Sequence, residues 1–349
     1  MLKGILLVNL GTPDSPSVAD VRKYLTEFLM DERVIDIHPF LRFLLVRGII
    51  VPFRAPKSAR LYQEIWDPQT GSPLLYNSRL QQELLQQELG DEYVVELAMR
   101  YQQPSIADGL AKLKAATADE IQIIPLFPQY ASATNGSVIA EVMRVIRTWH
   151  TIPPVTISGP FYNHRLFIRA FAAKARRHDL ADYDHTLFSF HGLPLSHLRD
   201  CAGSGKCGGH DAGCCQQINS QNKLCYAAQC HESARLIAAE LQLNTSEFTI
   251  CFQSRLGKQE WIQPYTSTVI QQLAAAGKKR LLVLCPAFIS DCLETIQEIG
   301  AEYRDEFIAA GGEQMQLVES LNDSLIFIRM LRELSEGSLA ISGRGPLAV

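Results

Sequence analysis

Residues 4–28, GILLVNLGTPDSPSVADVRKYLTEF, contain the pattern that decides the fold. The apolar run at 4–10 predicts a short buried strand, and the GTP sequence at 11–13 ends it in a turn. Ser17 is a typical helix N-cap, and apolar residues recur at helical spacing from there to Phe28. A strand, a turn and a helix in this order are the usual opening of a doubly wound α/β domain. Because the turn lacks the full glycine-rich dinucleotide fingerprint, we predict no nucleotide cofactor.

Strands and helices continue to alternate along the rest of the chain. Further strands are predicted at 93–99, 121–127, 155–157, 186–191, 248–253, 280–285 and 316–318, with helices between them at 58–65, 77–89, 106–115, 137–149, 164–177, 221–241, 265–275, 291–308 and 323–334. The fold class is therefore α/β, with two similar Rossmann-like domains, each a parallel sheet flanked by helices, and an active-site cleft between them. The Thr-Ile-Pro-Pro sequence at 151–154 predicts a boundary. We expect an N-terminal domain at 1–152, a C-terminal domain at 153–335 and a disordered tail at 336–349.

Charge and composition narrow the class of partner. The 349 residues include 33 basic and 37 acidic side chains, so the net charge is −4. No basic cluster is present, and we therefore predict no binding to nucleic acid. The first residues pass directly into an apolar strand without the pattern of a cleavable signal, which predicts a cytoplasmic protein.

The most apolar window is 39–53, PFLRFLLVRGIIVPF. It is too short to cross a bilayer, and Arg42, Arg47 and Gly48 interrupt it. Two interpretations stay open. The window is either a buried helix or a basic and apolar lip that makes peripheral contact with the inner membrane.

His191 stands at a strand end, within SFHGLP at 189–194. Ligands of α/β proteins bind at the carboxyl ends of the strands. A lone histidine there is more often held by a nearby carbonyl than used in catalysis. Its function therefore depends on what lies beside it.

A row of carboxylates follows the apolar strand at 280–285. Helical spacing places Glu294, Glu298 and Glu302 on one face, with Asp291 almost in line with them. This face is either solvated surface or a path along which carboxylates pass protons or a divalent metal. A His191–Glu294 pair at one sheet edge could hold a metal and leave coordination positions open, as suits a metal in transit.

Aromatic and cationic residues follow several other strands. Arg255 and Trp261 come after the strand at 248–253, while Arg100 and Tyr130 follow strands of the first half. They are either core and surface residues, or opposite walls for a flat apolar ligand that carries carboxylates.

Six sequences together resemble those of ferrochelatases, the enzymes that insert Fe²⁺ into a porphyrin. They are LLVNLGTP (6–13), MRYQQP (99–104), LFPQYASATNGS (126–137), SFHGLP (189–194), QSRLGKQEWIQP (253–264) and FISDCLETIQEI (288–299). The resemblance extends over residues 3–334. It implies a chelatase-like fold, His191 and Glu294 as catalytic and metal-binding residues on opposite sides of the macrocycle, and Arg100 and Tyr130 in the porphyrin cleft. Animal members have a histidine where this chain has Cys292.

The resemblance implies Fe²⁺ as a substrate and haem as the product, most simply from protoporphyrin IX. Two pyrrole protons must leave as the metal enters, and ring distortion would expose the nitrogen lone pairs. His191 is the candidate proton acceptor. Asp291, Glu298 and Glu302 would form the proton or metal path. The alternatives are a chelatase for another tetrapyrrole or metal, such as coproporphyrin or cobalt, and a non-catalytic haem-binding protein.

Six cysteines lie in a cysteine-rich loop at 201–230, a few residues after His191. Their spacing matches neither a zinc finger nor a common ferredoxin. Some bacterial ferrochelatases carry a [2Fe–2S] cluster, so a cluster, zinc and free thiols all stay open. The cluster ligands would be Cys207, Cys214, Cys215 and Cys225, with Cys201 as a substitute.

Overall fold

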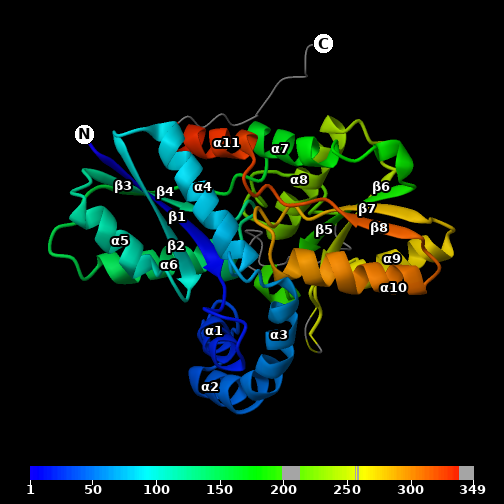
Figure 1. Ribbon diagram of the computed structural model, residues 1–349, viewed down its shortest axis with the longest axis horizontal. Coiled ribbons are helices and arrows are strands. Elements are labelled where there is room, and N and C mark those ends of the chain that lie inside the picture. The colour runs from blue at the N-terminus through cyan, green and yellow to red at the C-terminus, as the bar shows by residue number, and fades with distance from the viewer. Residues whose placement is uncertain (199–212, 256, 258, 338–349) are drawn as a thin grey trace, which may run out of the picture.

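The computed structural model describes residues 1–198, 213–255, 257 and 259–337, and these form two parallel four-stranded sheets side by side (Figure 1). The predicted α/β fold class is confirmed. The first sheet has the strand order β2-β1-β3-β4 and the second β6-β5-β7-β8. The strands are β1 (Lys3–Gly11), β2 (Tyr93–Tyr101), β3 (Glu120–Pro125), β4 (Val155–Ile157), β5 (His185–His191), β6 (Phe248–Gln253), β7 (Arg280–Leu284) and β8 (Gln314–Leu317).

The strands β1 and β5 lie inside their sheets because their sequences are apolar on both faces. In β1, residues 5–8 have no exposed surface, and in β5 Leu187, Phe188 and Phe190 are equally buried. Continuous apolar runs are typical of parallel strands covered by helices on both sides. Each of these strands has a neighbour on both sides, and the topology reverses next to them. Ligand sites in open parallel sheets form at such a reversal.

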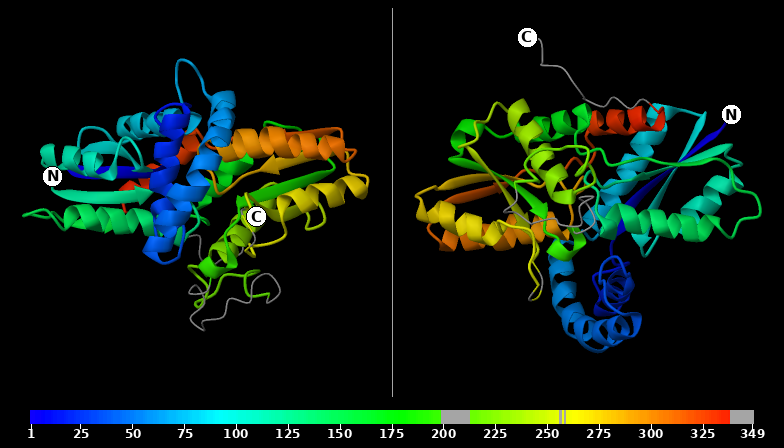
Figure 2. Two further views of the ribbon diagram at one scale, coloured as in Figure 1. Left: turned by 90° about the horizontal axis from the view of Figure 1, so that it is seen from below. Right: turned by 180° about the vertical axis from the view of Figure 1, so that it is seen from behind.

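Helices cover both faces of the two sheets (Figure 2). They are α1 (Val18–Met30), α2 (Pro39–Leu45), α3 (Val51–Ile65), α4 (Pro73–Leu89), α5 (Ile106–Ala115), α6 (Ser137–Ile146), α7 (Arg165–Ala175), α8 (Tyr226–Glu240), α9 (Thr266–Ala275), α10 (Arg304–Ala309) and α11 (Leu325–Ser335). Three π-helical segments join them: η1 (Val46–Ile50), η2 (Ser132–Gly136) and η6 (Glu294–Tyr303). Short 3₁₀ turns occur at η3 (Leu180–Asp182) and η4 (Leu195–Leu198).

The strand pairing differs from the predicted boundary at residue 152. β4 pairs with β3 in the first sheet, although the sequence boundary assigns it to the second half. The prolines at 153 and 154 therefore precede an edge strand, where a missing N–H costs little, and do not separate the two sheets.

The last helix, α11, connects the two halves. It lies beside α4 and α7 along the upper edge of the molecule in Figure 1. At its carboxyl end, the Lys3 ammonium donates to the Ser335 carbonyl at 2.7 Å, and the Gln122 amide donates to the Leu334 carbonyl at 2.8 Å. The carboxyl-terminal helix is thus fastened to strands of the first sheet.

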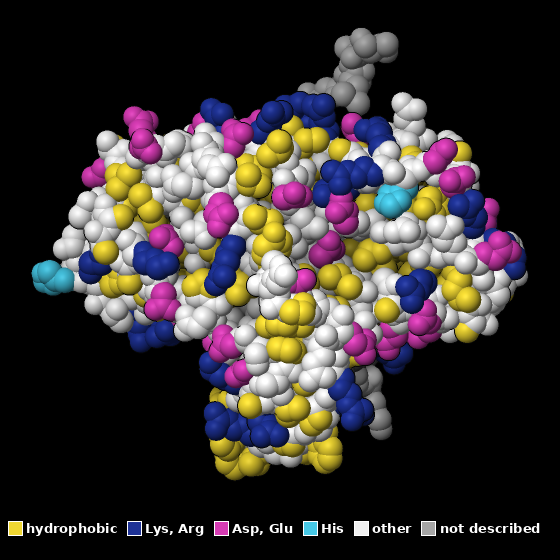
Figure 3. All heavy atoms as spheres, viewed as in Figure 1, with side chains coloured by type: hydrophobic (Ala, Val, Ile, Leu, Met, Phe, Trp, Pro, Cys, Tyr) yellow, Lys and Arg dark blue, Asp and Glu magenta, His cyan; other side chains and the backbone are white. Residues whose placement is uncertain are grey.

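Helices α1, α2 and α3 project below the sheets. Residues 39–65 are continuously helical, and the tip of the projection is apolar and basic (Figure 3). Its exposed apolar side chains, called the lip below, are Phe40, Leu41, Phe43, Leu44, Ile49 and Phe53. Phe53 is 73% exposed, so the buried-helix interpretation of 39–53 is wrong for this face. No helix in the described residues is long and apolar enough to cross a membrane.

Two predicted helices begin later than expected. α8 starts at Tyr226 with Cys225 as its N-cap residue, although the sequence placed the start at 221. The acidic helix starts after Cys292, and its first ten residues are π-helical. The part of the predicted tail beyond residue 337 lies outside the described residues. So do Cys201 and Cys207.

Candidate active site

His191 is the last residue of β5, and its ring has a defined orientation. Its Nδ1 lies 2.6 Å from the Gly192 carbonyl oxygen. A carbonyl can only accept a hydrogen bond, so this contact requires the proton on Nδ1, and in the neutral ring the lone pair is then on Nε2. The Tyr226 hydroxyl donates to the His191 carbonyl at 2.8 Å, which fixes the backbone beneath the ring. A contact with a carbonyl is what an ordinary strand-end histidine would make. Here this contact uses Nδ1 and leaves Nε2 available as a base.

Two aromatic side chains contact the imidazole. The ring centroids of Trp261 and Phe288 lie 6.5 and 6.3 Å from that of His191. Gly192 permits this packing, because a Cβ there would lie 2.7 Å from the Gln253 carbonyl oxygen and 3.2 Å from the indole. Trp261 is 9% exposed, and its indole N–H has no partner among the described residues.

The acidic helix lies against the neighbouring strand β6 through Gln253. This side chain is buried, and its amide nitrogen donates to the Glu294 carbonyl at 2.8 Å and to the Glu298 carboxylate at 3.1 Å. Gln253 is also the register partner of His191 in the β5–β6 ladder. The predicted pair, His191 and Glu294, is thus brought to one sheet edge by a residue that the sequence reasoning did not select. A polar residue in register with a strand-end histidine is the signal that could have identified it.

Glu298 is held by three donors. Besides Gln253, the Ser254 hydroxyl donates to it at 2.5 Å and the Tyr303 hydroxyl at 3.2 Å. Glu302 lies further along the helix at an exposed position. The limited desolvation of its carboxyl and the Glu298 charge raise its pKa. Glu294 and Glu298 belong to the same π-helical segment as Glu302, in which hydrogen bonds run from residue i to i+5.

Asp291 does not belong to that helical face. It precedes the helix, and its carboxylate accepts hydrogen bonds from Thr295 Oγ1 at 3.1 Å, Ser320 N at 3.2 Å and Asn322 Nδ2 at 2.7 Å. These bonds tie the start of the helix to the loop after β8. The expected alignment of Asp291 with Glu294 assumed an α-helix that begins earlier.

Glu294 lies where the two domains meet. The preceding residue, Leu293, packs on the apolar core of α1 and α3, which includes Tyr24 and Tyr62. Burial and then the Glu294 charge raise the pKa of Tyr24. The same two causes, in the same order, raise the pKa of the Cys292 thiol. Burial and the Glu294 charge therefore disfavour a thiolate at Cys292, the position at which the animal members have a histidine.

Arg100 is bound within the first domain by a carboxylate that the sequence did not single out. Its Nη2 lies 2.7 Å from Asp31 Oδ2, and its Nε donates to the Ser137 hydroxyl at 2.6 Å. Asp31 Oδ2 also accepts from Tyr101 Oη at 2.9 Å. Burial alone raises the pKa of Asp31, but the bonds from Ser137, the Arg33 N–H, Arg100 and Tyr101 together hold it below its usual value. This guanidinium organises the end of β2.

The other predicted porphyrin residues are more open. Tyr130 is partly buried, and its N–H donates to Gln229 at 2.6 Å. Arg255 is exposed and lies over the Tyr265 ring at 4.8 Å. Arg33, which the sequence reasoning missed, donates at 3.0 Å to Ser132, the first residue of η2, two positions after Tyr130.

Three of the predicted cluster cysteines gather next to the start of α8. Cys214 Sγ lies 3.6 Å from Cys215 Sγ. A hydrogen bond to Cys225, then burial, raise the pKa of Cys215, so these two thiols are neighbours as well. Nevertheless, in the ranges that the structure describes, no group of three or more His, Cys, Asp or Glu side chains has the arrangement of a metal site.

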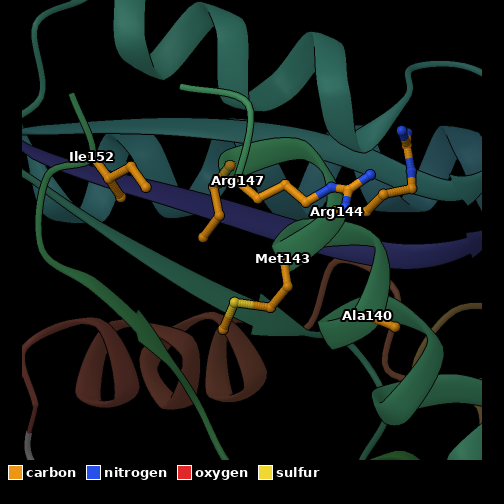
Figure 4. Close-up of a pocket in the computed structure, with 6 residues that line it drawn as sticks. Ala140, Met143, Arg144, Arg147 and Ile152 are labelled. Atoms are coloured by element: carbon orange, nitrogen blue, oxygen red, sulfur yellow. The ribbon is translucent and has the colours of Figure 1, made fainter. Parts of the chain in front are cut away.

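A surface hollow of about 600 Å³ lies elsewhere, along the second half of α6. Figure 4 shows Met143, Arg144 and Arg147 projecting from this part of the chain, with Ile152 nearby. None of the residues that line it belongs to the candidate site.

Comparison with known proteins shows the family to which the chain is similar. The family model described as ferrochelatase matches residues 2–339. A ferrochelatase of Legionella pneumophila (strain Lens) is 42% identical over 341 residues, which are 96% of this chain and 98% of the relative. A ferrochelatase of Coxiella burnetii (strain Dugway 5J108-111) is 40% identical, covering 97% of this chain and 94% of the relative. The solved structure of SirB from Bacillus subtilis with Fe³⁺ has a TM-score of 0.51 at 13% identity, with 97% of both chains covered, and shows the fold alone.

Proposed function

The chain belongs to the ferrochelatase family and inserts Fe²⁺ into a porphyrin to make haem, and we propose that His191 and Glu294 carry out this reaction from opposite sides of the ring. The observation that supports the roles best is the tautomer of His191. With Nδ1–H donated to the Gly192 carbonyl, Nε2 is the basic nitrogen that can take a pyrrole proton.

The chemistry of insertion requires both members of the pair. Free porphyrin holds two N–H protons in the plane of the ring, and each must leave as a metal–nitrogen bond forms. Nε2 of His191 accepts one proton at a time and returns it to solvent. Glu294 faces the other side and meets the dehydrating Fe²⁺ with carboxylate oxygens, which suit a hard or borderline cation. Glu298 and Glu302 lead away from it along the helix, and Glu302 at the exposed end exchanges with solvent, whereas Asp291 holds the start of the helix through Thr295 and Asn322.

Aromatic side chains and cations of the site are proposed to bind the porphyrin ring. Trp261 and Phe288 contact His191, and a flat apolar macrocycle stacks well on such side chains. Arg33 and Arg255 are cations that can pair with carboxylates of the ring. Arg100 is bound to Asp31 and so holds the end of β2 in place. Binding energy gained at the periphery can support a distorted ring that exposes its nitrogen lone pairs.

The test is an anaerobic insertion assay with Fe²⁺ and protoporphyrin IX. His191→Ala should reduce kcat by 10²- to 10⁴-fold, the usual contribution of general acid–base catalysis, while circular dichroism stays unchanged. His185→Ala, in the same strand but at its opposite end, is the control. Near-normal turnover by a folded His191→Ala protein would sink the proposed role.

The preferred substrate is proposed to be protoporphyrin IX. A mostly apolar, aromatic site with few converging cations suits a porphyrin that carries few carboxylates. The same assay with coproporphyrin, and with Co²⁺ in place of Fe²⁺, separates the alternatives. A higher kcat/KM for coproporphyrin would overturn this preference.

A [2Fe–2S] cluster on Cys207, Cys214, Cys215 and Cys225 is proposed for the cysteine-rich loop. Two thiolates on one tetrahedral metal lie roughly 3.8 Å apart, as follows from metal–sulfur bonds of about 2.3 Å. The 3.6 Å between Cys214 and Cys215 is close to that separation. Protein purified without air should absorb in the visible range and contain acid-labile sulfide. Colourless protein without sulfide would exclude the cluster, and bound zinc would support the zinc alternative.

The protein is also proposed to be cytoplasmic and to rest on the inner membrane through its lip. Six exposed apolar side chains share the helical stretch 39–65 with the exposed basic residues Arg47, Lys57 and Arg60, a combination that favours anionic lipid. The test is co-sedimentation with vesicles of phosphatidylcholine and phosphatidylglycerol. The double variant Phe40→Ser/Phe53→Ser should lose binding at least tenfold, whereas Ile152→Ser, at an exposed apolar site elsewhere, should not. Equal binding by both variants would contradict the proposal.

A further inference from the structure

Gln253 is placed between the two halves of the proposed catalytic pair. It ends β6, directly in register with His191 at the end of β5. Its side chain is 1% exposed, although it carries an amide that must be hydrogen-bonded to be buried without cost. The bonds it makes show what the residue holds in place.

The amide of Gln253 has a single orientation. Its Nε2 faces the Glu294 carbonyl and the Glu298 carboxylate, which can only accept. Its Oε1 therefore points the other way, where it accepts from the Ser189 hydroxyl at 2.9 Å. Ser189 belongs to β5, two residues before His191. The side chain thus connects the histidine strand to the first turn of the acidic helix.

The backbone of Gln253 acts on His191 itself. Its carbonyl accepts the Gly192 N–H at 2.8 Å, which sets the plane of the peptide that follows His191. The Gly192 carbonyl then accepts the His191 Nδ1–H at 2.6 Å. One residue therefore orients the imidazole through its main chain and the carboxylate helix through its side chain.

The next residue shows backbone strain at the same point. Ser254 has φ of +66°, a left-handed conformation that is unfavourable for a residue with a Cβ. In this conformation its hydroxyl reaches Glu298 at 2.5 Å. Strain of this kind persists where the surrounding structure requires it, and here it places a second donor on the carboxylate that Gln253 holds.

We propose that Gln253 is a positioning residue for metal insertion, which fixes Glu294 and Glu298 relative to His191 while touching neither the porphyrin nor the metal. The inference rests on the proposed roles of His191 and Glu294. Its consequence is that the buried amide matters for turnover with Fe²⁺ and not for binding of the porphyrin.

The test is Gln253→Met, which keeps the length of the side chain and removes the amide. The main-chain carbonyl stays, so the contact that orients His191 is retained, while the side-chain bonds to Glu294, to Glu298 and to the Ser189 hydroxyl are lost. Gln122→Met is the matched control, because Gln122 is also a buried amide and donates to Ser158 and Leu334 from β3, in the other sheet. We expect kcat/KM for Fe²⁺ to fall at least tenfold in Gln253→Met, with the porphyrin Kd, followed by fluorescence, within twofold of wild type.

Several outcomes would overturn the inference. One is that Gln253→Met and Gln122→Met lower the melting temperature by similar amounts and also lower kcat/KM by similar amounts. Another is a loss of porphyrin binding that accounts for the loss of turnover.

If Gln253→Met does not fold, Ser254→Gly decides, because glycine accepts a φ of +66° and only the hydroxyl is lost. A threefold or larger fall in kcat/KM supports positioning, and unchanged kinetics overturn it. Wild-type protein that inserts no metal would overturn the proposed function as well, whereas active wild-type protein with an unaffected Gln253→Met overturns the inference alone.

Discussion

Asp31→Asn is expected to destabilise the protein through the end of β2. One carboxylate oxygen of Asp31 accepts from Arg100, Tyr101 and Ser137, and the other accepts from the Arg33 N–H at 2.8 Å. Asparagine keeps one acceptor but removes the charge beside a guanidinium that is only 16% exposed. Breaking a buried ion pair costs about 3–5 kcal/mol. Since this pair is partly solvated, we expect a loss of about 2–3 kcal/mol.

The assay is thermal unfolding followed by circular dichroism. A loss of that size should lower Tm by roughly 3–5 °C in a chain of this length. Glu141→Gln is the matched control, because the Glu141 carboxylate pairs with Arg144, whose side chain is 60% exposed. Exposed pairs contribute about 0–1 kcal/mol, so the control should hardly shift Tm. Equal shifts in the two variants would refute the reasoning.

The pH dependence gives a second check. The pKa of Asp31 is lowered in the folded protein, so its stabilisation is present above the unfolded pKa of about 3.9 and is lost as pH falls through the folded value. The Tm difference between wild type and Asp31→Asn should therefore be constant from pH 7 to pH 5. A difference that disappears by pH 6 would contradict the assignment.

Three further predictions concern the site. Gly192→Ala places a Cβ 2.7 Å from the Gln253 carbonyl oxygen, so we expect a loss of about 1–3 kcal/mol in stability and a clear fall in kcat; unchanged thermal melting and turnover would contradict this. Glu294→Gln should reduce kcat for Fe²⁺ insertion about as severely as His191→Ala, and steady-state kinetics with a normal porphyrin Kd would confirm a role in insertion. Glu298→Gln should be less damaging in the same assay, since the amide oxygen can still accept from Gln253 and Ser254; a larger loss than in Glu294→Gln would reverse the two roles.

Much of the fold was predictable because it depends on local sequence pattern. Apolar runs ending in Gly or Pro marked the strands, and helical periodicity marked the segments between them. Errors arose where tertiary contacts set the outcome. β4 joined the first sheet because β3 offered a free edge, and α8 began only at Tyr226, after Cys225.

The candidate site residues could be selected from the sequence, but the hydrogen bonds that connect them could not. His191 and Glu294 could be selected from strand ends and motif resemblance. The expected alignment of Asp291 failed because the helix begins after Cys292 and starts as a π-helix. For residues 39–53 the sequence allowed both a buried helix and an exposed lip, since an amphipathic sequence does not reveal which face is covered.

The sequence by itself determined the alternation of strands and helices, the family, and the identity of the histidine and the carboxylates. These follow from residue order, which fixes local conformation and places strand ends at one sheet edge. Only the tertiary structure decided that Nδ1 of His191 faces the Gly192 carbonyl, that Arg100 is bound to Asp31, and that Gln253 joins β6 to the acidic helix. Each of these depends on hydrogen bonds between residues distant in sequence or on the exact direction of a carbonyl, and no local pattern encodes such directions.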